Sequence, residues 1–120
     1  MKRRIARINE QLRRELSEIL RFEVRDPRLG QANVTEVDTT ADLERARVYL
    51  DVPGDDAAKE EAVEGARAAA AFIRGALARR IELRHMPELH FEIDRTLEQA
   101  RRIERILDEV LPGPEADEAE

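Results

Sequence analysis

Residues 45–52 read Arg-Ala-Arg-Val-Tyr-Leu-Asp-Val, and this stretch decides the fold. Its apolar residues Ala46, Val48, Leu50 and Val52 occupy every second position, and most of the residues between them are charged. Successive side chains of a β-strand point to opposite faces of the sheet. The stretch therefore predicts a strand that buries one face and exposes the other.

Two more strands are predicted on either side of this one. Residues 33–39 form a β-branched run, and the short segment 40–44 that follows is typical of a hairpin. Residues 88–94 again alternate apolar and polar side chains. The chain therefore contains three strands, enough for one small sheet.

Three helical stretches accompany the strands. Residues 3–24 carry Ile and Leu at spacings of three and four, the stripe of an amphipathic helix, and Asp26-Pro27 ends it. Residues 57–82 would make an unbroken helix about 39 Å long, too long to cover a three-stranded sheet. We therefore expect a kink near residues 69–75. Residues 96–111 form a last amphipathic helix.

The expected fold is α+β: one domain over residues 1–111, in the order helix, strand, strand, kinked helix, strand, helix. Its three-stranded sheet should have the helices packed on one face. Residues 112–120 are too acidic and too poor in apolar side chains to bury anything, so we expect a disordered tail.

The net charge of −6 conceals basic segments. Six acidic residues between positions 108 and 120 account for all of it, and residues 1–107 carry 21 basic and 21 acidic groups. Residues 67–84 hold five arginines and one glutamate, whereas residues 51–64 hold six acidic groups and one lysine. Basic and acidic surfaces should therefore lie on different parts of one domain.

Several classes of protein are disfavoured by composition. The chain has no cysteine, so it has neither disulfides nor a thiolate metal site, and its two histidines make a poor metal set. No nucleophile triad, glycine-rich phosphate loop or membrane-length apolar run is present. We expect a cytoplasmic protein that is not an enzyme and that uses no cofactor, metal or small-molecule substrate.

A set of motifs runs through most of the chain in a specific order. They are Arg-Asp-Pro-Arg-Leu at 25–29, Ala-Asp-Leu at 41–43, Ala-Arg-Val-Tyr at 46–49, Ala-Phe-Ile-Arg at 71–74, Ile-Glu-Leu-Arg at 81–84 and Pro-Glu-Leu-His-Phe at 87–91. Their order and spacing resemble the ribosome-binding factor A family of bacteria. The resemblance implies a KH-like domain of type II without the usual Gly-x-x-Gly loop.

In place of that loop the family has a helix kink built around Ala-x-Gly. The matching residues here are Ala69, Ala70 and Ala71, so alanine stands where the family has glycine. Gly75, four residues further on, is another source of flexibility.

The resemblance also implies a function. Members bind free 30S subunits and assist late maturation and processing of 16S ribosomal RNA near its 5′-terminal helix, with a link to growth in the cold. The expected partners are therefore the 30S subunit and 16S ribosomal RNA, bound by a monomer.

Two groups of arginines are the candidate RNA-binding residues. KH domains hold nucleic acid beside the helix–loop–helix, and the arginines that would flank this groove are Arg67, Arg74, Arg79, Arg80 and Arg84. A second group, Arg3, Arg4 and Arg7, lies at the start of the first helix. Either group could instead be a solvated helix face, but phosphate would neutralise both.

Two other functions compete with this one. A general KH-type RNA chaperone should carry a true Gly-x-x-Gly loop or exposed stacking aromatic side chains, and we identify neither in the sequence. A protein-interaction module could instead use the acidic residues 55–64 and the acidic tail to bind basic proteins.

Overall fold

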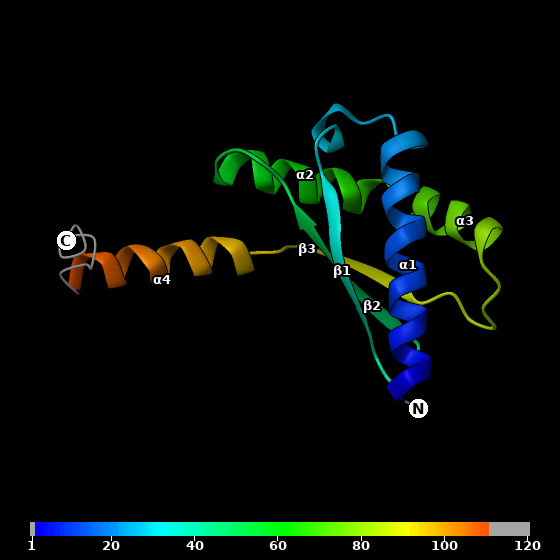
Figure 1. Cartoon of the computed structure of the whole chain (residues 1–120). Helices are drawn as coiled ribbons and strands as arrows, with labels where there is room; N and C mark the ends of the chain where they lie inside the picture. The colour runs from blue at the N-terminus through cyan, green and yellow to red at the C-terminus, as the bar shows by residue number, and fades with distance from the viewer. Residues whose placement is uncertain (1, 111–120) are drawn as a thin grey trace.

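The structure is a computed structural model that describes residues 2–110, apart from the side chains at positions 2, 97, 98 and 101. The predicted tail, 112–120, lies outside the described residues. The elements are α1 (Lys2–Phe22), a 3-10 turn η1 (Pro27–Leu29), β1 (Asn33–Thr39), β2 (Arg45–Asp51), α2 (Asp56–Ala68), α3 (Ala70–Arg80), β3 (Glu88–Ile93) and α4 (Thr96–Val110). Figure 1 shows this arrangement.

The three predicted strands form one sheet in the order β1-β2-β3. β1 and β2 are the arms of an antiparallel hairpin, with a bulge between Val34 and Glu36. β3 pairs parallel with β2, so the chain must cross the sheet between them, and α2 and α3 form that crossover. β2 is therefore the central strand.

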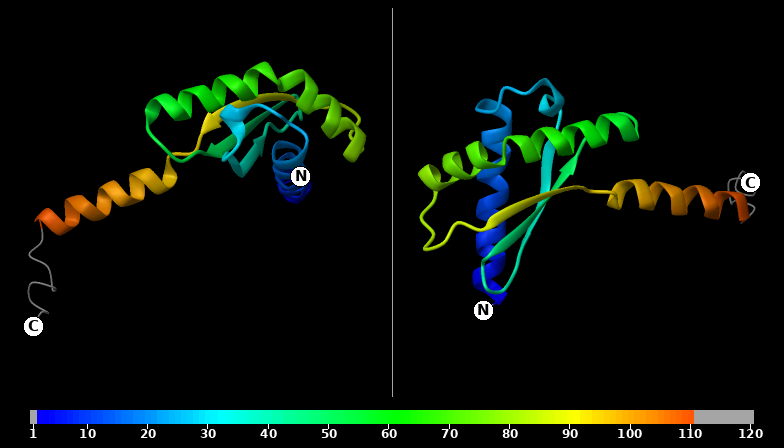
Figure 2. Two further views of the ribbon diagram at one scale, coloured as in Figure 1. Left: turned by 90° about the horizontal axis from the view of Figure 1, so that it is seen from above. Right: turned by 180° about the vertical axis from the view of Figure 1, so that it is seen from behind.

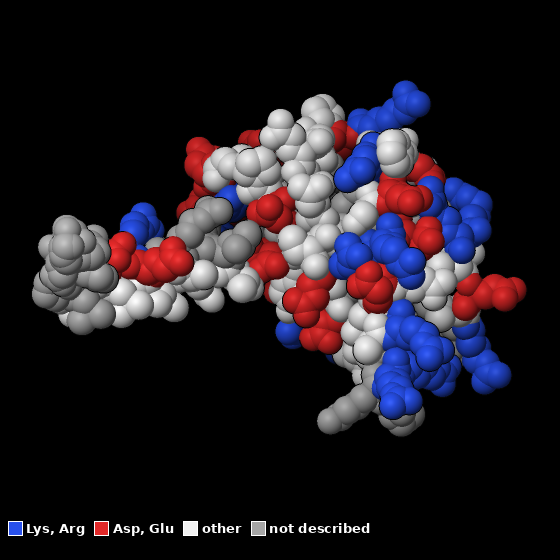
Figure 3. All heavy atoms as spheres, viewed as in Figure 1, with Lys and Arg blue, Asp and Glu red and all other residues white. Residues whose placement is uncertain are grey.

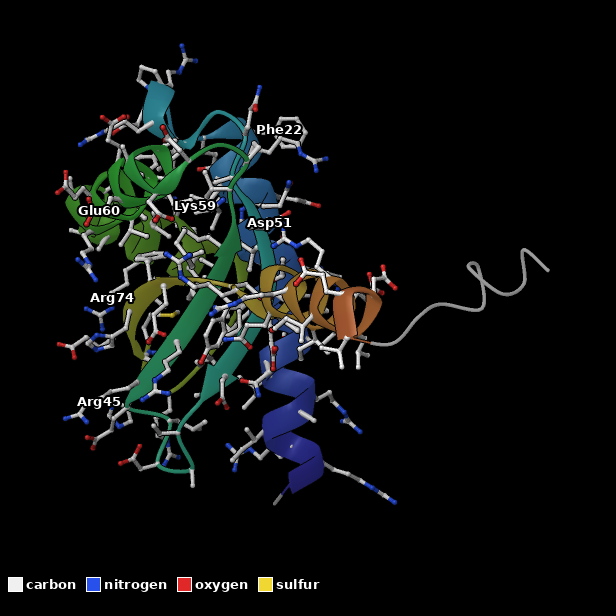
Figure 4. All side chains as sticks on the ribbon, turned by 90° about the vertical axis from the view of Figure 1, so that its left-hand side faces the viewer. Phe22, Arg45, Asp51, Lys59, Glu60 and Arg74 are labelled. Carbon is white, nitrogen blue, oxygen red and sulfur yellow. The ribbon has the colours of Figure 1, made fainter. Side chains whose placement is uncertain are left out.

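Helices α1, α2 and α3 cover one face of the sheet, which confirms the predicted α+β class. The α1 stripe is fully buried at Leu12, Leu16 and Ile19, where it packs mainly on β1. From the sheet, Val48 and Phe91 close the core. The opposite face of the sheet, viewed in Figure 4, is uncovered and polar.

The predicted kink lies at Ala69. Its backbone, with φ −93° and ψ 4°, ends α2 and begins α3, and no side chain caps the new helix. Hydrogen bonds still pass through the break, since Ala69 N donates to Gly65 O and Ile73 N to Ala69 O. Figure 2 shows the two helices lying nearly end to end. Alanine therefore suffices for the bend, and α3 continues through Gly75 without interruption.

Gly65 is buried where α2 meets the turn after α1. A Cβ added there would lie 3.2 Å from both Arg28 Nε and Asp26 Oδ2. These two atoms belong to an ion pair, in which Arg28 Nη2 lies 2.7 Å from the Asp26 carboxylate. A glycine that weakens a helix interior by about 1 kcal/mol thus makes room for the Arg-Asp-Pro-Arg-Leu turn.

Helix α4 forms as predicted but does not pack with the others. It projects from the end of β3, away from the body (Figures 1 and 2). Asp94 accepts a hydrogen bond from Thr96 N, which caps the helix, and Arg95 lies 3.7 Å from Asp56. Its apolar side chains are exposed, by 58% at Ile103 and 68% at Val110. The amphipathic pattern predicted that the apolar face of this helix would pack on the sheet, which it does not.

Candidate functional site

The N-terminal end of α1 carries an exposed group of three arginines. Arg3, Arg4 and Arg7, which we call the N-terminal arginine cluster, line a depression of about 480 Å³. The remaining lining residues are Ile8, Gln11, Glu82 and Leu83. The depression thus lies between α1 and the loop after α3. Figure 3 shows blue spheres gathered over this end of α1 and beside it.

Three arginines and one glutamate line the depression, so the charge of this cluster is only partly offset within the described residues. All three arginines are exposed, and none of them has a hydrogen bond or an ion pair there. The first turn of α1 contains no acidic residue. Unpaired N–H groups give a helix N-terminus a partial positive charge, so cations at this position are disfavoured. An anion in the depression would remove that penalty.

Arg80, by contrast, is neutralised from three sides. From the end of α3 its Nη1 lies 3.0 Å from Glu15 and 2.8 Å from Glu18, and its Nη2 lies 2.7 Å from Glu23. The hydrogen bonds with Glu23, Glu15 and Glu18 raise the pKa of Arg80 further above its ordinary value. This guanidinium holds α3 against α1. Sequence reasoning grouped it with the RNA-binding arginines because its partners belong to another helix.

Arg74 is also held in place, but by backbone carbonyls. Its Nε donates to Pro87 O at 3.1 Å and its Nη2 to Met86 O at 2.7 Å, which fixes the loop before β3. Because carbonyls do not cancel its charge, Arg74 stays cationic and exposed. With Arg45 it lines a second depression, of about 400 Å³, which is also lined by Asp42, Glu44 and Glu88. Figure 4 shows the two arginines on the same edge of the molecule.

The other three candidate arginines are free to contact a ligand. Arg67 on α2, Arg79 on α3 and Arg84 in the following loop are exposed, with no hydrogen bond or ion pair among the described residues. Arg84 comes directly after the loop residues that line the arginine depression. The structure thus brings the N-terminal arginine cluster and the loop of Arg84 together. The RNA-binding role of all eight arginines stays a prediction.

Exposed aromatic side chains are present, so the sequence-based statement that they are missing is wrong. Phe22 is 69% exposed at the end of α1, and Phe72 is 50% exposed on α3. The Phe22 ring already has the Arg21 guanidinium 5.8 Å from its centroid. Phe72 could have been found from the sequence because it lies beside the Ile73–Leu77 stripe and outside it.

The uncovered face of the sheet is polar and internally paired. Arg47 lies 3.6 Å from Glu92, and His90 Nε2 lies 3.0 Å from Glu88. Among the side chains that the structure describes, no three acidic or histidine groups gather as a metal site. Nor, within residues 2–110, is any helix both long and apolar enough to cross a membrane.

Comparison with known proteins decides the family. The family model of ribosome-binding factor A matches residues 4–107. The chain belongs to the ribosome-binding factor A family. A ribosome-binding factor A of Acetivibrio thermocellus is 43% identical over 107 residues, 88% of this chain and 87% of that protein. One of Thermomicrobium roseum is 41% identical over 116 residues, 97% of this chain and 90% of that protein.

Solved structures of ribosome-binding factor A share the fold. The crystal structure of the Thermus thermophilus factor matches with a TM-score of 0.68 at 30% identity, covering 74% of this chain and 93% of that one. A homology model of the Thermus thermophilus factor, fitted into a cryo-electron-microscopy map of its complex with the 30S subunit, matches with a TM-score of 0.61 at 31% identity. It covers 72% of this chain and 91% of that one.

Proposed function

We propose that this protein binds the 30S ribosomal subunit through 16S ribosomal RNA and assists a late step of its maturation. Membership of the ribosome-binding factor A family supports the partner. The observation that carries the mechanism is the N-terminal arginine cluster: three exposed cations without partners at a helix end that repels them. A phosphate backbone supplies the missing anions.

The arginines divide into two roles in this proposal. Arg67, Arg79 and Arg84 join the N-terminal arginine cluster in contacting phosphates, because the described structure leaves their guanidinium groups unpaired. Arg74 and Arg80 act through the structure, one by fixing the loop before β3 and the other by fixing α3 on α1. Each phosphate contact releases counterions, so binding should weaken steeply as salt rises.

The finer function follows from the same proposal. The bound factor acts near the 5′-terminal helix of 16S ribosomal RNA, assists its processing and matters most for growth in the cold. Cells that carry only a variant without the N-terminal arginine cluster should therefore accumulate 16S precursor at low temperature. Normal processing in such cells at low temperature would refute this part.

Binding is tested by co-sedimentation with purified 30S subunits over a salt series. Replacing Arg3, Arg4 and Arg7 by Gln should lower affinity and reduce the slope of log K against log salt by about two to three, at 0.7–0.9 for each phosphate contact. Arg7→Gln is also compared with Arg13→Gln. Arg13→Gln is the control, because Arg13 already pairs with Glu10. Arg13→Gln should change the slope less.

The same assay separates the competing protein-interaction function. The acidic side chains Glu60 and Glu61 lie on the exposed surface of α2. Suppose that Glu60→Gln with Glu61→Gln abolishes 30S binding, while the triple arginine variant binds normally. The acidic surface would then be the interface, and the RNA proposal would be wrong.

A further inference from the structure

The outer surface of α3 combines one exposed ring with small residues and cations. Phe72 is 50% exposed. One helical turn before it lies Ala68, and one turn after it lies Gly75, neither of which has a side chain long enough to cover the ring. The ring therefore projects beyond its small neighbours on the helix. Among the described residues, no neighbouring group is stacked on it.

The Arg79 guanidinium lies over the residue one turn after this ring. A Cβ built at Gly75 would lie 3.9 Å from Arg79 Nη1, so the Arg79 side chain reaches back over Gly75. Gly75 is one turn, about 4.5 Å along the axis, from Phe72. Residues 66–81 contain four arginines and no acidic residue. Of these four, Arg80 is paired with carboxylates of other segments, so Arg67, Arg74 and Arg79 remain, and the helix that carries the ring contributes no carboxylate.

An apolar ring beside unpaired arginines fits a nucleotide in both of its parts. An aromatic face stacks on an unpaired base, and an arginine beside it holds the neighbouring phosphate. The alternative, that the ring is only exposed to solvent, leaves unexplained why residues 66–81 contain no carboxylate in so charged a chain.

We propose that Phe72 is a stacking platform for an unpaired nucleobase of the bound RNA, with Arg79 on the adjacent phosphate. This rests on the proposed function and adds a contact that does not depend on charge. Phe22 is the natural comparison: it is more exposed, at 69%, but its ring is already beside Arg21, and it lies near Glu23.

The first test measures 30S binding by Phe72→Leu, Phe72→Tyr and Phe22→Leu across the salt series. Leu is a better helix former than Phe, so the variants should fold, and thermal melts check this. Phe72→Leu should lower affinity by about fivefold or more, the low end of the loss expected for one stacked base. Its salt slope should be unchanged. Phe72→Tyr keeps the ring and should bind within about twofold of the parent.

Wild-type affinity in Phe72→Leu, or an equal loss in Phe22→Leu, would overturn the proposal. If the triple arginine variant still binds weakly in the same experiment, only stacking has failed. If that variant also binds normally, the proposed function has failed with it.

The second test identifies what the ring touches. p-Azidophenylalanine in place of Phe72, irradiated in the 30S complex, should crosslink to 16S ribosomal RNA. A crosslink to a ribosomal protein, or none at all while position 79 crosslinks to RNA, would contradict base stacking at this residue.

Discussion

Each end of α1 carries a cluster of like charges, and the two clusters differ in whether another element of the protein pairs with them. At the N-terminal end, cations lie where the helix dipole disfavours them, and none of Arg3, Arg4 and Arg7 forms an ion pair within the described structure; Glu82 is the one carboxylate that lines their depression. Toward the C-terminal end, Glu15 and Glu18 of α1 and Glu23 just after it all pair with the one Arg80 guanidinium from α3. One end is satisfied within the molecule, and the other still lacks a partner.

The difference shows that a count of arginines does not measure the charge available for binding. Arg79 and Arg80 are neighbours in sequence, yet one is exposed without a partner among the described residues and the other is held by three carboxylates. Arginines without an ion-pair partner should contribute to binding, and arginines paired with carboxylates should contribute to stability. The predictions below test this division.

The largest effect is expected from reversing the charge of Arg80. Arg80→Glu would place a fourth carboxylate among Glu15, Glu18 and Glu23, so the melting temperature should fall by several degrees. Arg79→Glu is the matched control, because it also puts an anion in the last turn of α3 and carries the same dipole cost, about 0.3–1 kcal/mol, without meeting the three carboxylates. Equal melting temperatures for the two variants would remove the distinction between these arginines.

Reversing the opposite end of α1 should change stability in the other direction. Arg3→Glu with Arg4→Glu puts anions in the first turn, where each contributes about 0.3–1 kcal/mol at low salt. The free energy of unfolding, measured in urea, should therefore rise while 30S affinity falls. A variant that loses both stability and affinity would mean that these arginines have a partner within the protein.

A smaller effect concerns α3, the helix that carries Arg80 to α1. Gly75→Ala meets no close neighbour and should raise the free energy of unfolding by up to about 1 kcal/mol. Gly65→Ala should gain less or lose, because its Cβ would lie 3.2 Å from Arg28 Nε. Urea titrations compare the two variants. An equal gain in the free energy of unfolding would show that the Asp26–Arg28 turn moves aside at no cost.

The smallest effect is the pH dependence of the stability that the Asp26–Arg28 pair contributes. This ion pair, like those of Arg80, forms within the protein, in the turn after α1. Hydrogen bonds from the Arg28 side chain and backbone lower the pKa of Asp26. Its contribution to stability is therefore complete above the unfolded pKa, about 3.9, and is lost as pH falls through the lowered folded value. Asp26→Asn should flatten the loss of stability below pH 4. An unchanged acid profile would count against the pair.

The sequence predicted the sheet and the helices because their signals are local. Alternation at residues 45–52 was enough for the central strand, and length alone required a break in the helix before β3. The break lies at Ala69, within the predicted range, since the bend requires only a local change of backbone angles.

What the sequence could not predict depends on contacts between distant elements. Arg80 meets residues more than 50 positions away, and Gly65 matters because the Asp26–Arg28 turn lies on it. Helix α4 has a clear apolar face, but nothing in its pattern says that the face stays uncovered. The availability of each candidate arginine therefore had to come from the structure.

The parallel pairing of β3 with β2 has a consequence for how the chain is made. Synthesis runs from the N-terminus, so α1 and the β1–β2 hairpin leave the ribosome before the strand that completes their sheet. Phe91, fully buried in the core, is the last buried core residue in the described sequence, so the core closes only once β3 has been made. A chain truncated before β3 should therefore remain open to protease, and the full chain should be resistant.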